Sequence, residues 1–252
     1  MNNFINVPIV VYTHSDYEFI WKAIFSLLKK YSNNIDIHIF INDNNPYDLN
    51  NYYDLYNLKI HYYNDTLCWT YRVGKCLNEI NDEYLLFIHE DWLPINDISK
   101  NILSNMANFM KSMNSGYLLS YSHISITSKY DGIFTGYEDY YYYPESAHIF
   151  QPAIWNTRIF KEFCDNLKKN KNQNEDIDCL NFMSNKNCYS VQNIKTVTSL
   201  RTTNSLMFPH MHALSEGLWN FKKYPTLKKF LEEFGIETNT RGVHTWWELD
   251  TQ

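Results

Sequence analysis

The chain lacks the features that mark disulfide-bonded, zinc-binding or membrane-spanning proteins. Its 252 residues contain 5 cysteines with no Cys-x-x-Cys pair, which fits neither a disulfide framework nor a zinc–thiolate site. We therefore expect reduced thiols and a cytoplasmic setting. No apolar run is long enough to cross a bilayer. The first residues show neither the basic region nor the long apolar core of a signal peptide.

The net charge and the low glycine content also limit what the chain could be. The net charge is -6 without a long basic run, which argues against nucleic acid as the main partner. Only 7 glycines are present, whereas Asn, Ile, Tyr and Lys are abundant. That bias indicates an AT-rich genome, such as that of a large virus or a parasite, and says nothing about chemistry. For a viral protein the setting would be the host cytoplasm.

What the chain does have is a hydrophobic fraction of 44% and an aromatic fraction of 17%, enough for one large core. In the first half, apolar β-branched runs alternate with amphipathic segments. Ser15 and Glu18 stand in capping-box spacing and predict the start of a helix. Further strands and helices are expected as follows: strands at 8–12, 35–41, 58–63, 84–88 and 117–122, and helices at 66–80 and 98–113. This alternation predicts an α/β fold with a mainly parallel central sheet flanked by helices.

The second half is less regular. Helices are expected at 154–167, 176–183 and 225–234, with Gly235 ending the last one, and a late strand at 189–194. The tyrosine-rich run at 137–144 has no apolar period and is expected to be irregular or to form a binding loop. We expect a single domain over residues 1–252, with an irregular C-terminal part.

The most informative stretch is the strand at 84–88, which ends in His89, Glu90 and Asp91. Ligands of open α/β sheets bind at the carboxyl ends of the strands. Acidic side chains there need a cation, a partner or water. A divalent metal that carries a diphosphate is one interpretation, and a strand that simply ends at the surface is the other.

These blocks, in this order, resemble a GT-A-type glycosyltransferase, especially family-2-like members, over most of the chain. Thr13 and His14 look like part of the opening nucleotide-binding turn. Asp43 follows the second strand, where such enzymes hold the base or ribose, and Arg72 stands where it could reach the nucleotide. The resemblance implies that residues 1–125 form the nucleotide-binding half and that 126–252 form the acceptor-binding half and tail.

The resemblance also implies a metal site for Mn²⁺ or Mg²⁺. His-Glu-Asp replaces the family's Asp-x-Asp motif and keeps an acid at its last position, so Asp91 is the expected metal ligand, with Glu90 next to contact the metal or the nucleotide. A late histidine can complete such a site. We favour His212 over the alternatives His210 and His244.

On the acceptor side, the resemblance points to two further groups. Gln151 and Trp155 lie in a segment similar to the one beside the acceptor pocket. Glu175 and Asp176 fall where inverting members carry the catalytic base. The alternative for these two acids is an ordinary acidic first turn of a helix, which favours the helix dipole.

The function implied is transfer of a sugar from a nucleotide-diphosphate donor, with a UDP-sugar favoured, to a hydroxyl of a glycan, protein or small molecule, with metal assistance and inversion. Two alternatives remain open. One is an iron and 2-oxoglutarate oxygenase that uses His89, Asp91 and a late histidine, with Arg241 holding the oxoglutarate. The other is a non-catalytic protein of the same fold that binds a nucleotide or glycan.

Overall fold

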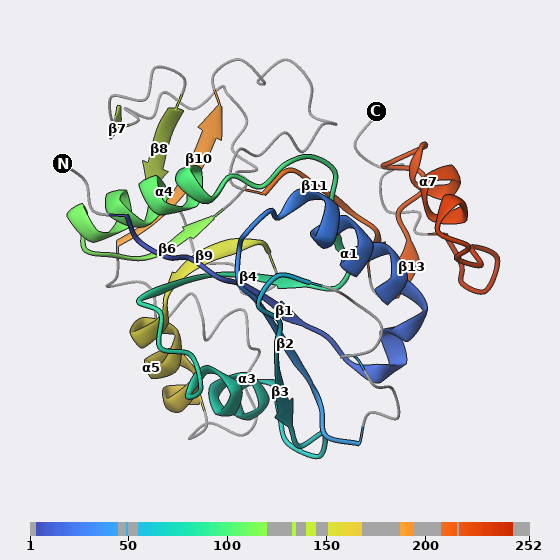
Figure 1. Ribbon diagram of the computed structural model, residues 1–252, viewed down its shortest axis with the longest axis horizontal. Helices are drawn as coiled ribbons and strands as arrows, with labels where there is room; N and C mark the ends of the chain where they lie inside the picture. Colours follow the sequence, from blue (N-terminus) through green and yellow to red (C-terminus); the bar gives the residue numbers. More distant parts are fainter. Residues whose placement is uncertain are drawn as a thin grey trace, which may run out of the picture.

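The computed structural model describes residues 4–44, 49, 55–119, 133–134, 140–144, 151–167, 187–193, 208–215 and 217–243. Within these residues nine strands form one sheet, in the order β3-β2-β1-β4-β9-β6-β10-β8-β7 (Figure 1). The strands are β1 (Ile9–Tyr12), β2 (Ile37–Asn42), β3 (Lys59–Tyr63), β4 (Tyr84–His89), β6 (Ser115–Leu119), β7 (Ile133–Phe134), β8 (Tyr140–Pro144), β9 (Ala153–Asn156) and β10 (Asn187–Asn193).

The sheet is mainly parallel, as the sequence predicts. Strands β1, β2, β3 and β4 run in one direction. Strand β9 lies antiparallel between β4 and β6, β10 is parallel to β6, and β8 and β7 add an antiparallel edge. Strands from both halves of the chain therefore share one sheet.

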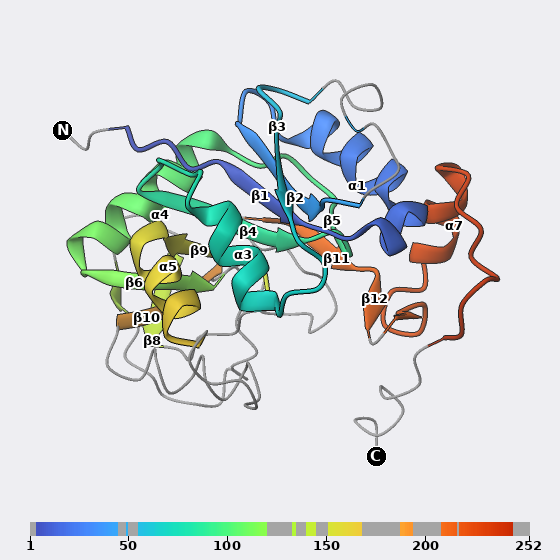
Figure 2. The same cartoon turned by 90° about the horizontal axis from the view of Figure 1, so that it is seen from below.

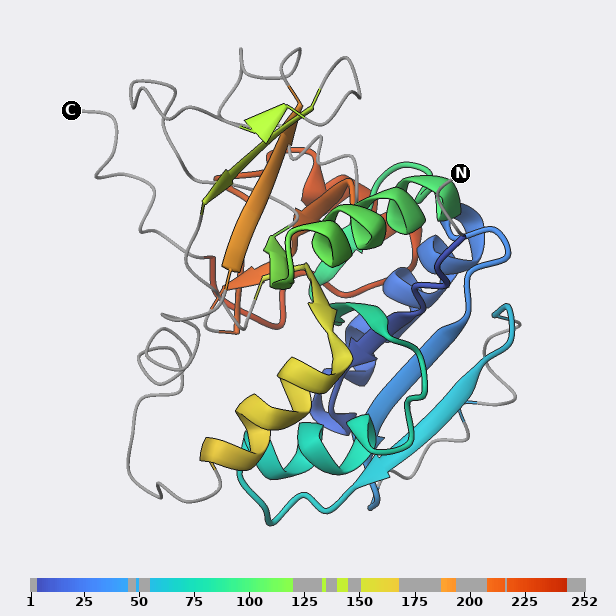
Figure 3. The same ribbon diagram turned by 90° about the vertical axis from the view of Figure 1, so that its left-hand side faces the viewer.

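Helices cover both faces of the sheet. α1 (Glu18–Tyr31) and α4 (Lys100–Ser112) lie on one face, and α3 (Trp69–Leu77) and α5 (Thr157–Leu167) lie side by side on the other (Figures 1 and 3). Strand β1 shows the consequence, because Ile9 and Val11 join the core under α1 while Val10 joins the core under α3. A strand buried on both faces has no polar face, which explains its unbroken apolar run.

The helix after β1 does not begin with the expected capping box. A short 3-10 turn, η1 (Ser15–Tyr17), precedes α1. The Ser15 hydroxyl accepts from the Asn42 side-chain nitrogen at 2.9 Å, and the Ser15 backbone N–H donates to Asn42 Oδ1 at 2.8 Å. Ser15, which the local spacing predicted as a helix cap, is therefore hydrogen-bonded to Asn42 at the end of β2. These bonds connect the turn after β1 to β2.

The helix expected at 154–167 is correct only from Thr157 onward. Residues 153–156 form β9, which pairs with both β4 and β6, and Asn156 Oδ1 accepts from the Ile159 N–H at 3.2 Å at the start of α5. An apolar run between two strands is compatible with a strand or a helix, and tertiary pairing decides between them. The helix expected at 176–183 lies outside the described residues, as do 120–122 of one expected strand and 137–139 of the tyrosine-rich run. The rest of that run, expected to be irregular or a binding loop, instead forms strand β8, which pairs with β10.

The C-terminal part consists of short elements, as expected (Figure 2). Strand β11 (His210–His212) pairs with β5 (Trp92–Pro94), and β12 (Leu214–Ser215) pairs with β13 (Leu218–Trp219). Helix α7 (Leu227–Glu233) is followed, after its C-cap Phe234, by Gly235, whose φ of 72° is a conformation that glycine adopts without strain. No helix in the described ranges is both long and apolar enough to span a membrane.

Candidate functional site at the carboxyl ends of the parallel strands

The strand order reverses between β1 and β4. From β1 the chain moves to β2 and β3 on one side, and then returns to β4 on the other side of β1. Such a reversal is where open α/β sheets bind ligands. The residues that follow these two strands are Thr13 and His14 after β1, and Glu90 and Asp91 after β4. The expected nucleotide-binding turn and the acidic motif are therefore neighbours.

Asp91 and His212 come together at this point from positions 121 residues apart. The pairing of β11 with β5 sets His212 opposite Trp92, and the Ala213 N–H donates to the Asp91 carbonyl at 2.7 Å. His212 Nε2 then lies 3.1 Å from Asp91 Oδ2. The His212 ring stacks on Trp92 with centroids 3.9 Å apart and planes within 3°. Backbone and ring contacts thus fix the imidazole against the carboxylate.

The donor set suits a metal shared with a substrate. In the described part of the chain, no group of three His, Cys, Asp or Glu side chains converges on one point. Asp91 and His212 would supply two ligands, and Asp91 Oδ1 is buried with no hydrogen-bond partner among the described residues. Mg²⁺ sites in nucleotide enzymes use one or two carboxylates and fill the remaining positions with phosphate oxygens and water. The residues present fit such an ion.

Glu90 has different surroundings from Asp91. It is only 5% exposed, and Thr13, which is fully buried, bonds to it through its hydroxyl. That hydroxyl also accepts from the Trp21 indole N–H at 2.8 Å. Burial, and next the charge of Asp91, raise the pKa of Glu90 well above its ordinary value. Glu90 is therefore a buried acid whose nearest described polar contact is Thr13, and Thr13 is itself fully buried.

The other histidines of the predicted set are placed differently from His212. His210 is fully buried, and its ring meets Trp92 edge-on at 4.7 Å. Burial lowers the pKa of His210 to about 3 and that of His89 to about 4, so both rings stay neutral. His244 lies outside the described residues. Of the late histidines that the structure describes, only His212 faces Asp91.

A second polar cluster lies at the ends of β1 and β3. His14 Nε2 lies 2.9 Å from Asp65 Oδ2, and Arg72 Nη2 lies 3.2 Å from Asp65 Oδ1. The Arg72 guanidinium stands 5.4 Å from the Tyr63 ring centroid, and Tyr63 stacks on Tyr12 at 5.3 Å. The two expected nucleotide residues, His14 and Arg72, are thus joined by one carboxylate.

Sequence reasoning missed Asp65 and the aromatic pair. Asp65 follows β3 at the same end of the sheet, so the rule that polar residues after parallel strands form ligand sites would have found it. The expected Asp43 is also at this end. Its backbone N–H donates to the Tyr63 carbonyl at 2.8 Å, while its side chain is exposed.

The acceptor-side predictions have mixed outcomes. Trp155 is fully buried and stacks on Phe160 at 4.3 Å, so it is a core residue and does not fit an acceptor contact. The pairing of β9 with β4 ends at Ala153, opposite Phe87, and Gln151 lies in a bend just before it, partly exposed. Glu175 and Asp176 lie outside the described residues.

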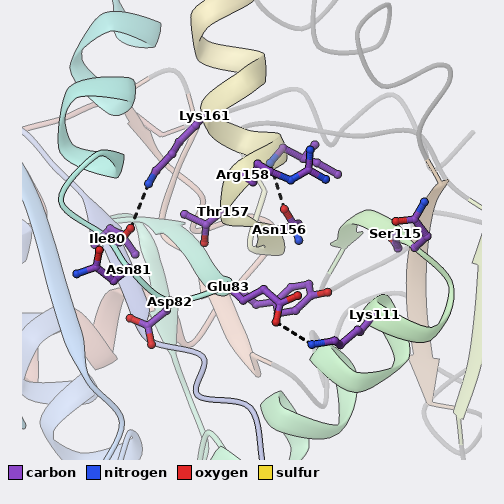
Figure 4. Close-up of a pocket in the computed structure, with 13 residues that line it drawn as sticks. Ile80, Asn81, Asp82, Glu83, Lys111, Ser115, Asn156, Thr157, Arg158 and Lys161 are labelled. Atoms are coloured by element: carbon purple, nitrogen blue, oxygen red, sulfur yellow. Dashed lines mark hydrogen bonds and ion pairs between the residues drawn. The ribbon is translucent and has the colours of Figure 1, made fainter.

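A separate groove opens at the other end of the sheet, where strand β4 begins. It encloses about 560 Å³ between the start of β4, the end of β9 and the first turn of α5 (Figure 4). Its charges are largely paired within the protein. Lys111 bonds Glu83 at 3.1 Å, and Lys161 donates to the Ile80 carbonyl at 3.1 Å. The groove is lined by none of the residues His14, Asp65, Arg72, Asp91 and His212.

Comparison with known proteins supports the fold. No family model and no curated protein matches the chain. Staphylococcus aureus TarS (residues 1–349) in complex with UDP is similar in structure, with 12% identity, a TM-score of 0.51, and coverage of 93% of this chain and 68% of TarS. The glycosyltransferase GlyE of Streptococcus pneumoniae matches with 10% identity, a TM-score of 0.45, and coverage of 73% and 45%.

UDP-glucose pyrophosphorylase complexed with UDP-glucose matches with 11% identity, a TM-score of 0.45, and coverage of 74% of this chain and 90% of the pyrophosphorylase. At such identities the similarity concerns the fold alone, and the TarS comparison carries it. Together with the strand order and the helices on both faces, it shows that the chain has a GT-A-type α/β fold.

Proposed function

We propose that the protein is a family-2-like glycosyltransferase that moves a sugar from a nucleotide-diphosphate donor, by preference a UDP-sugar, to a hydroxyl acceptor. The observation that carries the proposal is the contact between Asp91 and His212 at the end of β4, where the strand order reverses. A carboxylate with one oxygen that has no hydrogen-bond partner among the described residues, beside an imidazole, is suited to Mn²⁺ or Mg²⁺ that also binds a diphosphate.

The donor's nucleoside would bind at the ends of β1 and β3. His14, Asp65 and Arg72 form a hydrogen-bonded group there, next to the stacked rings of Tyr12 and Tyr63. Such a combination of hydrogen-bonding groups and flat apolar surface is what a base and a ribose require. The diphosphate would then lie toward Asp91, at the neighbouring strand end.

In the reaction, the bond between the sugar's anomeric carbon and the diphosphate oxygen breaks, and its electron pair stays on that oxygen. A bound divalent cation would neutralise the charge that builds up there. Asp91 and His212 would hold the ion, with their geometry fixed by the Ala213 hydrogen bond and the Trp92 stack. The acceptor oxygen bonds to the anomeric carbon and passes its proton to a general base. We propose Asp176 or Glu175 for this role, which is worth roughly 10²–10⁴-fold in rate.

The test is isothermal titration of the protein with UDP in the presence of Mn²⁺ and in the presence of chelator. Wild-type protein should bind UDP more tightly with Mn²⁺. Asp91→Asn should lose that difference, because an amide is a weak ligand for a divalent ion. Asp97→Asn, which alters an exposed carboxylate, is the matched control and should bind as wild type does. Metal-dependent binding that persists in Asp91→Asn would refute the assignment of Asp91.

A non-catalytic nucleotide-binding protein is the second candidate, because burial of Glu90 leaves Asp91 as the one partly exposed acid of the motif. That protein would bind UDP without ever releasing UDP from a UDP-sugar. The oxygenase alternative is not favoured. It requires a β-sandwich-like barrel, whereas the sheet is mainly parallel and covered by helices.

A further inference from the structure

The strand that carries His212 is very short. Strand β11 has three residues and pairs with β5, with His212 opposite Trp92. Directly after His212 the chain turns into β12, which forms a hairpin with β13 (Figure 2). Because a ladder of three residues gives little hold at its last position, the turn that follows β11 decides where the His212 imidazole lies.

Both polar groups of the peptide unit that joins His212 to Ala213 are hydrogen-bonded. On one side, the Ala213 N–H donates to the Asp91 carbonyl at 2.7 Å. On the other side, the His212 carbonyl accepts from Asn220 Nδ2 at 2.9 Å. A peptide unit is planar, and its N–H and C=O point in opposite directions. The two bonds therefore fix the plane of this unit, and with it the Cα from which the His212 ring projects.

Asn220 makes this bond from a buried position inside the hairpin. Its side chain is fully buried. Its backbone N–H donates to the Ala213 carbonyl at 3.0 Å, and its Nδ2 also donates to Ser215 Oγ at 3.0 Å. A primary amide carries two N–H donors, so one short side chain holds the His212 carbonyl and Ser215 together.

The surroundings of Asn220 indicate a role beyond stability. Its Oδ1 is buried and has no hydrogen-bond partner among the described residues. A buried acceptor without a partner costs free energy of folding, and such a group in a native protein calls for an explanation. An apolar side chain would avoid this cost but could not donate to the His212 carbonyl. That hydrogen bond is therefore the explanation that the structure offers for an amide at this position.

We propose that Asn220 is a positioning residue, which holds the His212 imidazole against Asp91 by fixing the peptide unit after His212. Asn220 itself contacts neither the metal nor the substrate. The inference rests on the proposed function and adds to it the residue that sets the geometry of the two metal ligands. Residues that orient metal ligands from behind typically change metal affinity by about tenfold to a hundredfold when they are replaced.

The experiment measures the Mn²⁺ advantage, which is the ratio of UDP affinity with Mn²⁺ to UDP affinity with chelator, by isothermal titration of the full chain. The test variants are Asn220→Ala and Asn220→Asp. Aspartate keeps the shape of the side chain and lacks both donors, so it replaces the alanine variant if that variant folds poorly. Circular dichroism checks that each protein is folded.

Two control variants separate positioning from general loss of stability. Ser215→Ala removes the other acceptor of the Asn220 amide and leaves the bond to His212. Leu231→Ala shortens a fully buried side chain on α7 and lowers the stability of the C-terminal part. Both controls should keep the Mn²⁺ advantage of wild type. Asn220→Ala and Asn220→Asp should lower it by about tenfold or more, with UDP binding in chelator unchanged.

A double-mutant cycle tests whether Asn220 acts through His212. In His212→Gln the imidazole is absent, so the further change Asn220→Ala should leave the remaining Mn²⁺ advantage as it is. A full Mn²⁺ advantage in Asn220→Ala, or the same further loss in the double variant, would overturn the assignment of Asn220 alone. If wild type showed no Mn²⁺ advantage, the proposed function itself would fail, and the inference with it.

Discussion

At the level of single residues, adjacent acids at the end of β4 have opposite environments. Glu90 and Asp91 form the turn between β4 and β5. Glu90 turns toward Thr13 and is buried, whereas Asp91 turns toward His212 and remains partly exposed. In the sequence the two acids differ by one methylene group, so their separate roles follow only from the surrounding fold.

Glu90→Gln should therefore be mild and Glu90→Ala severe. Glutamine keeps a neutral polar group beside the Thr13 hydroxyl. Alanine leaves that buried hydroxyl with one fewer partner, at a cost of about 1–3 kcal/mol in the free energy of unfolding. Urea denaturation at neutral pH measures this cost, and UDP titration with Mn²⁺ checks that Glu90→Gln retains metal-dependent binding. Loss of that binding in Glu90→Gln would make Glu90 a ligand after all.

The histidines of β11 provide a second contrast. His212→Gln should reduce Mn²⁺-dependent UDP binding by about tenfold or more, because the ion loses its imidazole ligand, with little change in stability. His210→Gln should lower the unfolding temperature, because His210 is fully buried between Trp92 and Phe208. Each variant serves as the other's control. The reverse pattern would assign the ligand to His210.

At the scale of elements, a polar chain joins β2 and β3 to Glu79, which follows α3; its two histidines are buried and Glu79 is exposed. His38 Nδ1 and His61 Nε2 lie 2.8 Å apart, and His61 Nδ1 lies 2.8 Å from Glu79 Oε2. Burial, followed by the charges of His61 and Lys59, lowers the pKa of His38 from 6.5 to about 4, with Asp36 acting in the opposite direction. His38 is therefore neutral in the folded protein.

This chain predicts a loss of stability in acid. The folded pKa of His38 lies below its unfolded value, so its contribution is complete above about pH 6.5 and is lost as the pH falls toward about 4. Between pH 7.5 and pH 5 the loss amounts to about 2 kcal/mol. Urea denaturation at both pH values should show a steeper decline for wild type than for His38→Leu. Equal declines would show that His38 does not remain neutral in the fold.

Most elements of the first half are predicted to within two or three residues, because buried strands and amphipathic helices have strong periodic patterns. The start of α1 and the strand β9 are not. In each case a partner distant in sequence decides the structure. Asn42 forms a hydrogen bond with Ser15, and residues 153–156 pair with β4 and β6. Local spacing contains no information about such partners.

At the scale of the whole molecule, the α/β fold and the position of the candidate site follow from the alternation of elements and from acids at a strand end. The candidate site is only partly predictable. Resemblance supplied His212, because nothing in residues 84–94 indicates which later segment will pair with β5. Trp155 is predicted to contact the acceptor but is a core residue. The sequence of a short motif does not distinguish an aromatic residue that lines a pocket from one that fills the core.

The central claim is metal-assisted binding of a nucleoside diphosphate at the end of β4, and a thermal-shift screen tests it most directly. UDP, GDP and CMP would each be added with Mn²⁺ and with chelator. The account predicts a higher unfolding temperature for UDP with Mn²⁺, equivalent to about 2.7 kcal/mol at a hundredfold excess over the dissociation constant, and a smaller rise with chelator. No rise with any nucleotide, or the same rise in chelator, would contradict the account.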